Sequence, residues 1–297
     1  MKRTLVAAAV IGAFILAALP TAAGAATKQQ CPKQPTRNVQ YRKVKGVDPK
    51  LLSVDIFPPE TGCPAPVVMW VHGGGWQIGD KSNQMANKVK LLNDLGDVVV
   101  SVNYRLTDPS SANPVQYPTH AEDVAAAAWV HENITKYGGD PKQIALMGHS
   151  AGAQIVANIA TDPQFLAAHD LALDDLACVA PLDTEGFDVT RQGQLGTPLY
   201  VDAFGTDPEV WAEASAINHV DRGAGIPPHL LVRRGTLPRQ RQLEAYADAL
   251  TAAGVPVTIV DARGLSHNEV NAQIGAPGDT VMTQAVTSFL EGCFASV

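Results

Sequence analysis

The sequence is poor in charged residues and has no basic run. Charged side chains make up 17% of its 297 residues, and the formal net charge at pH 7 is −7. A protein that binds nucleic acid needs a basic stripe to neutralise phosphates, so this absence argues against a nucleic-acid partner. The 46% hydrophobic content is typical of a globular chain with a sizeable core.

Motifs that hold metals or nucleotides are also missing. There is no CxxC spacing, and none of the eight histidines belongs to an HExxH pattern, so a zinc site is not indicated. The glycines at 73–75 are not followed by the Gly-Lys-Ser/Thr ending of a phosphate-binding loop. We therefore expect neither a metal nor an organic cofactor.

The N-terminal segment is typical of a signal peptide. A short basic start precedes an apolar run over residues 5–19, and Ala-Gly-Ala at 23–25 offers a cleavage pattern. A membrane anchor is the alternative, but the run is short for a spanning helix. We predict a signal peptide over 1–25 and one domain over 26–297, secreted or periplasmic, with no membrane contact after cleavage.

Only four cysteines occur in the chain. In an exported protein they allow two disulfides, with three possible pairings. We favour Cys31–Cys63, which would join the N-terminal arm to the start of the sheet. The remaining pair, Cys178–Cys293, would join a late strand to the C-terminal tail. Four buried thiols are the alternative.

Short apolar runs alternate with longer helical stretches along the chain. The runs are continuous, which is typical of strands buried on both faces of a parallel sheet. This alternation predicts one doubly wound α/β domain with a mostly parallel sheet and right-handed connections. Residues 38–57 indicate an edge hairpin, and 183–215 a small lid over the carboxyl ends of the strands. The predicted strands are 67–71, 98–102, 144–147, 230–232 and 255–260, and the predicted helices are 83–95, 120–137, 152–160, 238–253 and 280–290.

Ser150 is the centre of the pentapeptide Gly-His-Ser-Ala-Gly, between a predicted buried strand and a predicted helix. A sharp turn at this point strains the backbone at the serine and lifts its hydroxyl above the sheet, and the flanking glycines allow close approach of the chain. A purely structural turn is the alternative, because the pentapeptide alone is a weak signal. Between a strand and a helix, it predicts a catalytic nucleophile.

A second glycine-rich element, His-Gly-Gly-Gly-Trp at 72–76, follows the first central strand. Three consecutive glycines cost chain entropy, and a loop that turns backbone N–H groups toward a developing oxyanion would explain them. We predict that Gly74 and Gly75, with Ala151 after the nucleophile, donate these N–H groups. A flexible turn is the alternative.

His267 is the candidate base because it follows the last central strand and comes after Ser150 in the chain. The other histidines fit this role less well. His72 and His149 belong to the two glycine-rich loops and more readily shape them. His120 falls in a predicted helix, where a surface position is the default. His219 is a candidate to line the lid.

Together these elements resemble secreted esterases of the α/β-hydrolase superfamily, near hormone-sensitive-lipase-like carboxylesterases and acetyl-xylan or feruloyl esterases. The resemblance spans residues 50–290. It rests on the two glycine-rich elements, Ser-Val-Asn-Tyr-Arg-Leu at 101–106 and Gly-Asp-Pro at 139–141. It implies a serine esterase that acts on small-molecule or polymer-borne esters without a cofactor. It also implies that the Tyr-Arg pair and Asp123 belong to the scaffold.

The chain departs from this family in the position of the acidic residue that should accompany Ser150 and His267. The resemblance implies an acid after the strand that precedes the last one, but residues 233–239 contain neither Asp nor Glu. An acid is still expected to hold the imidazole. The end of the preceding strand offers Asp183 as the first candidate and Asp188 as the second, and some hydrolases of this fold place their acid there. The alternatives are that both only cap turns or helices, or that Ser150 and His267 act without an acid.

The sequence therefore predicts a secreted serine esterase that forms an acyl-enzyme, with short acyl groups favoured because the lid is short. An amidase or a peptidase would use the same machinery. The missing acid also leaves open a non-catalytic binding protein on this fold. The oligomeric state stays undetermined at this point.

Overall fold

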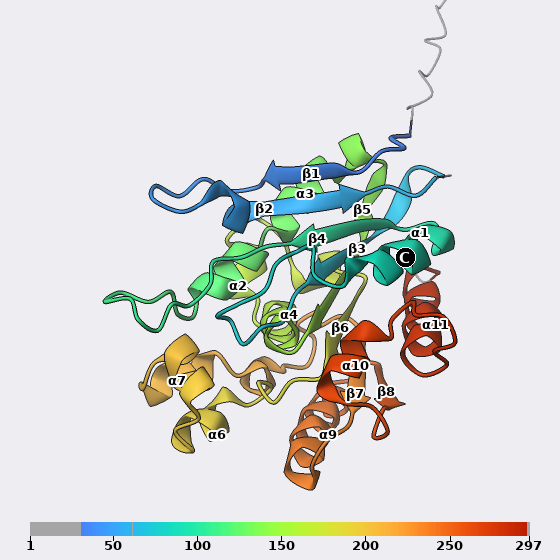
Figure 1. The fold of residues 1–297 in the computed structure, drawn as a ribbon. Helices are drawn as coiled ribbons and strands as arrows, with labels where there is room; N and C mark the ends of the chain where they lie inside the picture. Colours follow the sequence, from blue (N-terminus) through green and yellow to red (C-terminus); the bar gives the residue numbers. More distant parts are fainter. Residues whose placement is uncertain (1–30, 61, 296–297) are drawn as a thin grey trace, which may run out of the picture. The chain divides into compact units, whose positions relative to one another are not determined.

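An eight-stranded sheet forms the centre of the computed structural model, which describes residues 31–60 and 62–295. The strand order is β1-β2-β4-β3-β5-β6-β7-β8 (Figure 1). Only the pairings of β2 with β1 and with β4 are antiparallel, so the predicted doubly wound, mostly parallel sheet is confirmed. The strands are β1 (Thr36–Gln40), β2 (Ser53–Phe57), β3 (Ala65–Val71), β4 (Val98–Val102), β5 (Gly139–His149), β6 (Cys178–Leu182), β7 (His229–Arg233) and β8 (Val257–Asp261).

Helices cover both faces of the sheet. Successive side chains of a strand point to opposite faces, so Val67 and Met69 of β3 enter one buried cluster and Val68 and Trp70 enter the other. The first cluster includes side chains of α2 (Thr119–Val124), α3 (Ala127–Asn133), α4 (Ala151–Thr161) and α9 (Leu237–Ala252), and the second includes side chains of α1 (Met85–Leu95), α10 (His267–Ala272) and α11 (Met282–Phe294).

The five predicted strands and the edge hairpin are present, but the single helix predicted over 120–137 is wrong. That stretch forms α2, α3 and the 3₁₀ helix η2 (Ile134–Tyr137), with i→i+3 hydrogen bonds at Ala126 and Ala128. Burial of the alanine-rich turn against the core outweighs its helix propensity. The surface position expected for His120 is also wrong, because this side chain is 2% exposed and its Nε2 lies 3.0 Å from Thr107 Oγ1.

The segment 183–215 forms a small lid of three short helices, α6 (Val189–Gln194), α7 (Pro198–Phe204) and α8 (Pro208–Glu213). A proline stands in the first turn of α7 and of α8, where its missing N–H costs no helical hydrogen bond. Trp76 packs edge-on against Tyr200 and Phe204 of α7, at 5.1 and 5.0 Å between ring centroids. The lid is therefore fixed to the glycine-rich loop that follows β3.

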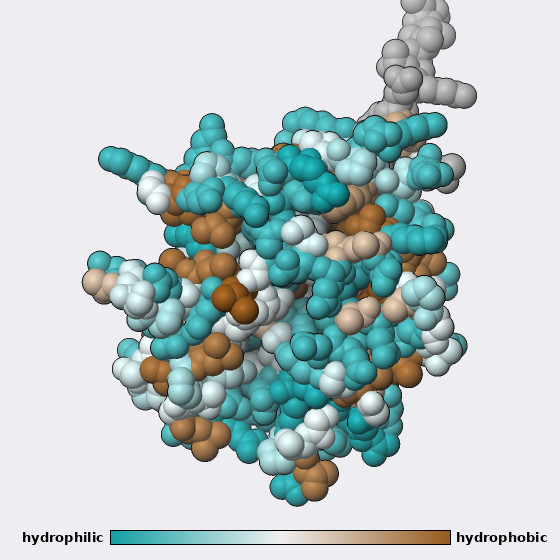
Figure 2. All heavy atoms as spheres, in the orientation of Figure 1, coloured by the Kyte–Doolittle hydropathy of each residue, from teal (hydrophilic) through white to brown (hydrophobic). Residues whose placement is uncertain are grey.

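Both favoured disulfides are present, Cys31–Cys63 and Cys178–Cys293. Within the described residues, no helix is long and apolar enough to cross a membrane. The face seen in Figure 2 is mostly hydrophilic, with hydrophobic residues in separate patches. The predicted signal peptide lies outside the described residues.

Candidate active site

Ser150 stands at the sharp turn between β5 and α4. Its φ of 59° and ψ of −117° lie in a region that non-glycine residues rarely adopt. The flanking glycines are required by close packing: a Cβ on Gly148 would lie 2.4 Å from Gly152 O, and one on Gly152 would lie 2.3 Å from Val71 O. The turn is thus held between β3 and β5 in the strained conformation that a nucleophile elbow needs.

A continuous chain of hydrogen bonds joins Ser150, His267 and Asp183. The Ser150 hydroxyl lies 2.9 Å from Nε2 of His267, and Nδ1 of His267 lies 2.6 Å from Oδ2 of Asp183. With the proton on Nδ1, Nε2 is free to accept the serine proton. Asp188 lies elsewhere: it caps α6, where its side chain accepts a hydrogen bond from the Arg191 N–H. Of the two candidate acids, Asp183 is the one that contacts His267.

Two arginines also hold Asp183, which follows β6 with a φ of 61° and is 2% exposed. Arg234 donates from Nε to Oδ2, and Arg239 donates from Nε to Oδ1 at 2.9 Å. Arg239 further reaches the Asp183 carbonyl at 3.0 Å and Glu185 at 2.7 Å. Burial raises the pKa of Asp183, but the hydrogen bond from His267 and the arginine charges outweigh it and lower the pKa to about 2.

His149 contacts His267 from its position beside the serine. Its Nε2 donates to the backbone carbonyl of His267 at 2.8 Å, and the two rings lie 4.4 Å apart between centroids. Burial and the neighbouring His267 lower the pKa of His149 to about 4, so this imidazole is neutral near pH 7. It therefore acts as a hydrogen-bond donor that positions the His267 backbone.

The glycine-rich loop after β3 is anchored at both ends. Tyr104 stacks on His72 at 4.5 Å and donates to the His72 carbonyl at 3.0 Å. At the other end, Trp76 Nε1 donates to Gln154 of α4 at 3.3 Å. Gly74 and Gly75 have φ of 118° and 61°, a backbone conformation that favours glycine. Such anchoring keeps the loop backbone in one conformation beside Ser150.

Two cavities flank the serine, and both are lined by Gly75, Ser150 and His267. The larger one, about 370 Å³, also includes Gly74. The smaller one, about 170 Å³, includes Ala151 and is lined by Leu199 and Tyr200 of the lid. The three predicted oxyanion residues thus line the space around the Ser150 hydroxyl.

A family model described as the alpha/beta hydrolase fold matches residues 68–271, which hold both glycine-rich elements and all three hydrogen-bonded side chains. The chain belongs to the α/β-hydrolase family. Its relatives there include Carboxylesterase NlhH from Mycobacterium tuberculosis, which is 30% identical over 236 residues, or 74% of this chain and 72% of the relative.

Solved esterase structures agree with this α/β-hydrolase assignment. A hyperthermophilic esterase from Pyrobaculum calidifontis is 25% identical, has a TM-score of 0.64, and aligns over 82% of this chain and 81% of its own. Esterase B from Lactobacillus rhamnosis, inhibited by a tributyrin phosphonate, has a TM-score of 0.72 over 91% of this chain and 89% of its own. At 18% identity, this second likeness shows the fold alone.

One cluster of side chains in this α/β-hydrolase offers the kinds of ligand atom that bind metal ions. Among the described residues, His149, Asp183 and His267 place one ligand atom each within 4.8 Å of one another. His267 contacts both the Asp183 carboxylate and the Ser150 hydroxyl, and His149 donates to the His267 backbone carbonyl. These ligand atoms are therefore engaged in hydrogen bonds within the site.

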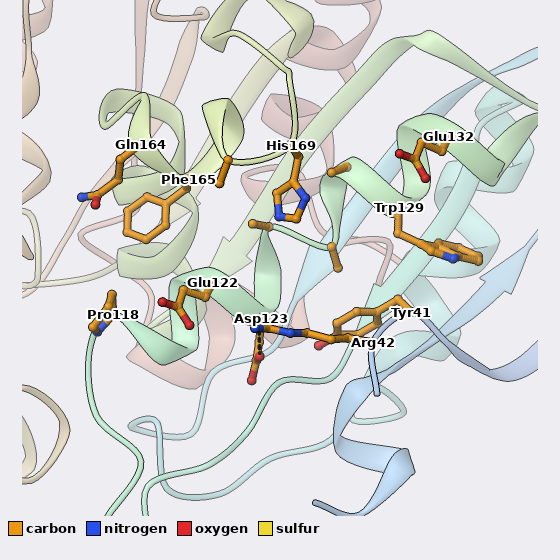
Figure 3. A pocket seen from close by; sticks show the side chains of 14 residues that line it. Tyr41, Arg42, Pro118, Glu122, Asp123, Trp129, Glu132, Gln164, Phe165 and His169 are labelled. Atoms are coloured by element: carbon orange, nitrogen blue, oxygen red, sulfur yellow. Dashed lines mark hydrogen bonds and ion pairs between the residues drawn. The ribbon is translucent and has the colours of Figure 1, made fainter. Parts of the chain in front are cut away.

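A larger cavity of about 540 Å³ lies away from the serine of this α/β-hydrolase (Figure 3). Tyr41, Trp129 and Phe165 line it, together with residues of α2, α3 and α5 (Gln164–Ala167). In it, Arg42 forms an ion pair with Asp123 at 3.2 Å. Asp123 also binds Arg105 at 2.7 Å, which fits the scaffold role expected of it. The cavity contains none of the side chains joined to Ser150.

Sequence reasoning did not identify Arg234, Arg239 and Gln154 as parts of this α/β-hydrolase site. A signal for the arginines was available, because the segment 233–239 that lacks an acid carries three of them. Gln154 offered no such signal, since a glutamine within a helix is usually solvated.

Proposed function

We propose that this carboxylic ester hydrolase uses Ser150 as its nucleophile, His267 as its general base and Asp183 as the acid that orients the base. The observation that carries the proposal is the unbroken chain of hydrogen bonds from Ser150 Oγ through both ring nitrogens of His267 to Asp183. A weakly nucleophilic hydroxyl needs an adjacent base, and the base needs a partner that fixes its tautomer.

The reaction begins when Oγ of Ser150 bonds to the ester carbonyl carbon while His267 Nε2 takes the hydroxyl proton. The N–H groups of Gly74, Gly75 and Ala151 stabilise the resulting oxyanion, at about 3–4 kcal/mol for each such donor in related chemistry. The bond to the alcohol oxygen then breaks, and His267 returns the proton to that oxygen. Water repeats the cycle on the acyl-enzyme and releases the acid.

Short acyl groups are the preferred substrates in this proposal. The cavity on the Ala151 side measures about 170 Å³ and is bounded by Trp76, Leu199 and Tyr200. The lid that lines it is packed against the loop of Trp76, so a long chain would have to displace packed aromatic rings. Long-chain esters that react much faster than acetates or butyrates would contradict this preference.

Export completes the proposal. Disulfides persist in oxidising compartments, and the chain has two of them together with the signal-peptide pattern over residues 1–25. We place the mature enzyme at 26–297 and outside the cytoplasm.

Covalent labelling tests the nucleophile. A fluorophosphonate probe reacts with activated serines, so intact mass should show one probe per purified parent chain and none on Ser150→Ala. Ser111→Ala, which changes an exposed loop serine, should be labelled like the parent. A folded parent that takes no probe would overturn the proposal, as would equal labelling of Ser150→Ala.

Arg239→Gln is expected to raise the pKa of Asp183, by on the order of one pH unit. Arg234, Arg239, Asp183 and Glu185 form a group whose charges cancel. The charge of Arg239 is one of the causes that lower the pKa of Asp183 to about 2, so its removal favours the protonated carboxyl. An NMR titration of the Asp183 carboxyl carbon is the measurement.

Two variants serve as controls for this change. Arg241→Gln removes the same charge from an exposed position of the same helix, and the pKa of Asp183 in it should match that of the parent. Arg239→Lys keeps the charge and should keep the pKa of Asp183 low. An unchanged pKa of Asp183 in Arg239→Gln would mean that Arg239 acts only through packing.

A further inference from the structure

Gln154 is a buried amide in the helix that follows the nucleophile. It lies in the first turn of α4, its backbone N–H donates to the Ser150 carbonyl at 3.2 Å, and its exposure is 2%. A buried amide needs hydrogen-bond partners at both of its ends. This one finds them in two other segments of the chain, so its side chain is fixed relative to the serine.

The amide of Gln154 joins the glycine-rich loop to the end of the lid. Its Oε1 accepts a hydrogen bond from Trp76 Nε1 at 3.3 Å, and its Nε2 donates to the Ala214 carbonyl at 3.1 Å. Ala214 directly follows α8, the last helix of the lid. An indole N–H can only donate and a carbonyl can only accept, so one orientation of the amide satisfies both partners.

The stem of the same side chain packs against the beginning of the lid segment. A Cβ on Gly186 would lie 2.6 Å from Gln154 Cγ and 2.9 Å from Gln154 Cβ, so a larger residue would collide with the glutamine. Gly186 lies shortly after Asp183 in the chain. Gln154 therefore contacts both ends of the segment 183–215 as well as the loop after β3.

Trp76 links Gln154 to the predicted oxyanion donors. It directly follows Gly75, and its φ of 61° is one that a bulky residue rarely adopts. Such a conformation persists where the surroundings enforce it. Here the ring is 2% exposed and packs edge-on against Tyr200 and Phe204. Because a buried indole N–H needs a partner, loss of the bond to Gln154 would favour other positions of the ring and of the backbone attached to it.

We propose that Gln154 is a positioning residue that couples the lid to the oxyanion hole. The lid fixes the amide through Ala214, the amide fixes Trp76, and Trp76 fixes the N–H groups of the glycines before it. Oxyanion donors are effective when they are aimed in advance at the developing charge. A lid displaced from Gln154 therefore lowers turnover without any change in the reacting side chains. The inference rests on the proposed function, because it requires Ser150 to form an oxyanion intermediate.

Gln154→Met tests the coupling, because methionine has a similar length but cannot form both hydrogen bonds. We expect kcat for phenyl acetate to fall about tenfold, less than on removal of a whole donor, and KM to stay within about twofold. A trifluoromethyl ketone, whose adduct with Ser150 carries an oxyanion, should bind about tenfold more weakly. Gln194→Met makes the same change at an exposed position of α6 and should keep the parental values.

A double-mutant cycle with Trp76→Phe assigns the effect to the bond between the two side chains. Phenylalanine keeps an aromatic ring against the lid but has no N–H, so each single variant removes the same hydrogen bond. The double variant should then lose about tenfold in kcat, like either single variant, and not about a hundredfold. Multiplied losses would overturn the inference. If Gln154→Met does not fold, Trp76→Phe measures the same loss with α4 unchanged.

The melting temperature separates positioning from packing. A lower melting temperature with parental kcat and parental inhibitor binding would mean that Gln154 only supports the fold, and would overturn the inference. Variants that take the fluorophosphonate probe and keep full turnover would refute this inference alone. A folded parent that takes no probe would refute the proposed function first.

Discussion

Asp183→Asn is expected to lower kcat for a short-chain ester by about 10⁴-fold, the loss seen when a triad acid becomes an amide. In the parent, Nδ1 of His267 donates to Oδ2 of Asp183. An amide nitrogen in that place would donate to Nδ1 instead, which moves the ring proton to Nε2 and blocks acceptance of the serine proton. The measurement is kcat with phenyl acetate at saturating concentration, with circular dichroism to verify the fold.

Asp188→Asn provides the matched control for this change. Asp188 caps α6, and asparagine is an equally good cap, so this variant should keep kcat within about twofold of the parent. If Asp183→Asn keeps near-parental turnover, the acid is dispensable and the Ser150–His267 pair acts without it. If Asp188→Asn instead loses activity, the acid has been assigned to the wrong residue.

His267→Ala should reduce kcat by about 10⁶-fold, because loss of the base alone costs about as much as loss of a whole triad. The variant should also react far more slowly with the fluorophosphonate probe, since the hydroxyl of Ser150 is no longer activated. The two readouts are independent, because labelling requires only the first half of the reaction. Initial rates with phenyl acetate and a labelling time course supply the measurements.

His219→Asn serves as the control for this variant. His219 lies at the end of a short 3₁₀ helix beyond the lid and contacts the Glu213 carbonyl at 2.7 Å. We expect parental turnover and labelling from it. Rapid labelling of His267→Ala would point to another base for Ser150.

The sheet could be predicted because its strands lie between two helical layers. Strands buried on both faces are mostly apolar, so Val98–Val102, in which only Ser101 is polar, and its parallel neighbours stand out as hydrophobic runs. Ser150 and the glycines before it were predictable for a related reason, since sharp turns and close approach restrict the residue types that fit. The interruption of the helix at 119–137 was not predictable from the sequence, because it depends on how small side chains pack.

For the acid that contacts the histidine, the sequence could only offer two candidates. Nothing local distinguishes Asp183 from Asp188, and the choice depends on which carboxylate meets an imidazole 84 residues later in the chain. Of the two arginines that hold Asp183, Arg234 lies in the loop after β7, where the family resemblance implied an acid, and Arg239 lies in α9.

The bridge between Cys178 and Cys293 bears on how the enzyme should be made. Cys178 begins the strand that ends immediately before Asp183, and Cys293 lies in the last helix. The covalent link therefore lies one strand length from the Asp183 carboxylate. Material produced in a reducing host lacks this link unless it is oxidised afterwards, so recombinant batches should be compared only after their thiols have been counted.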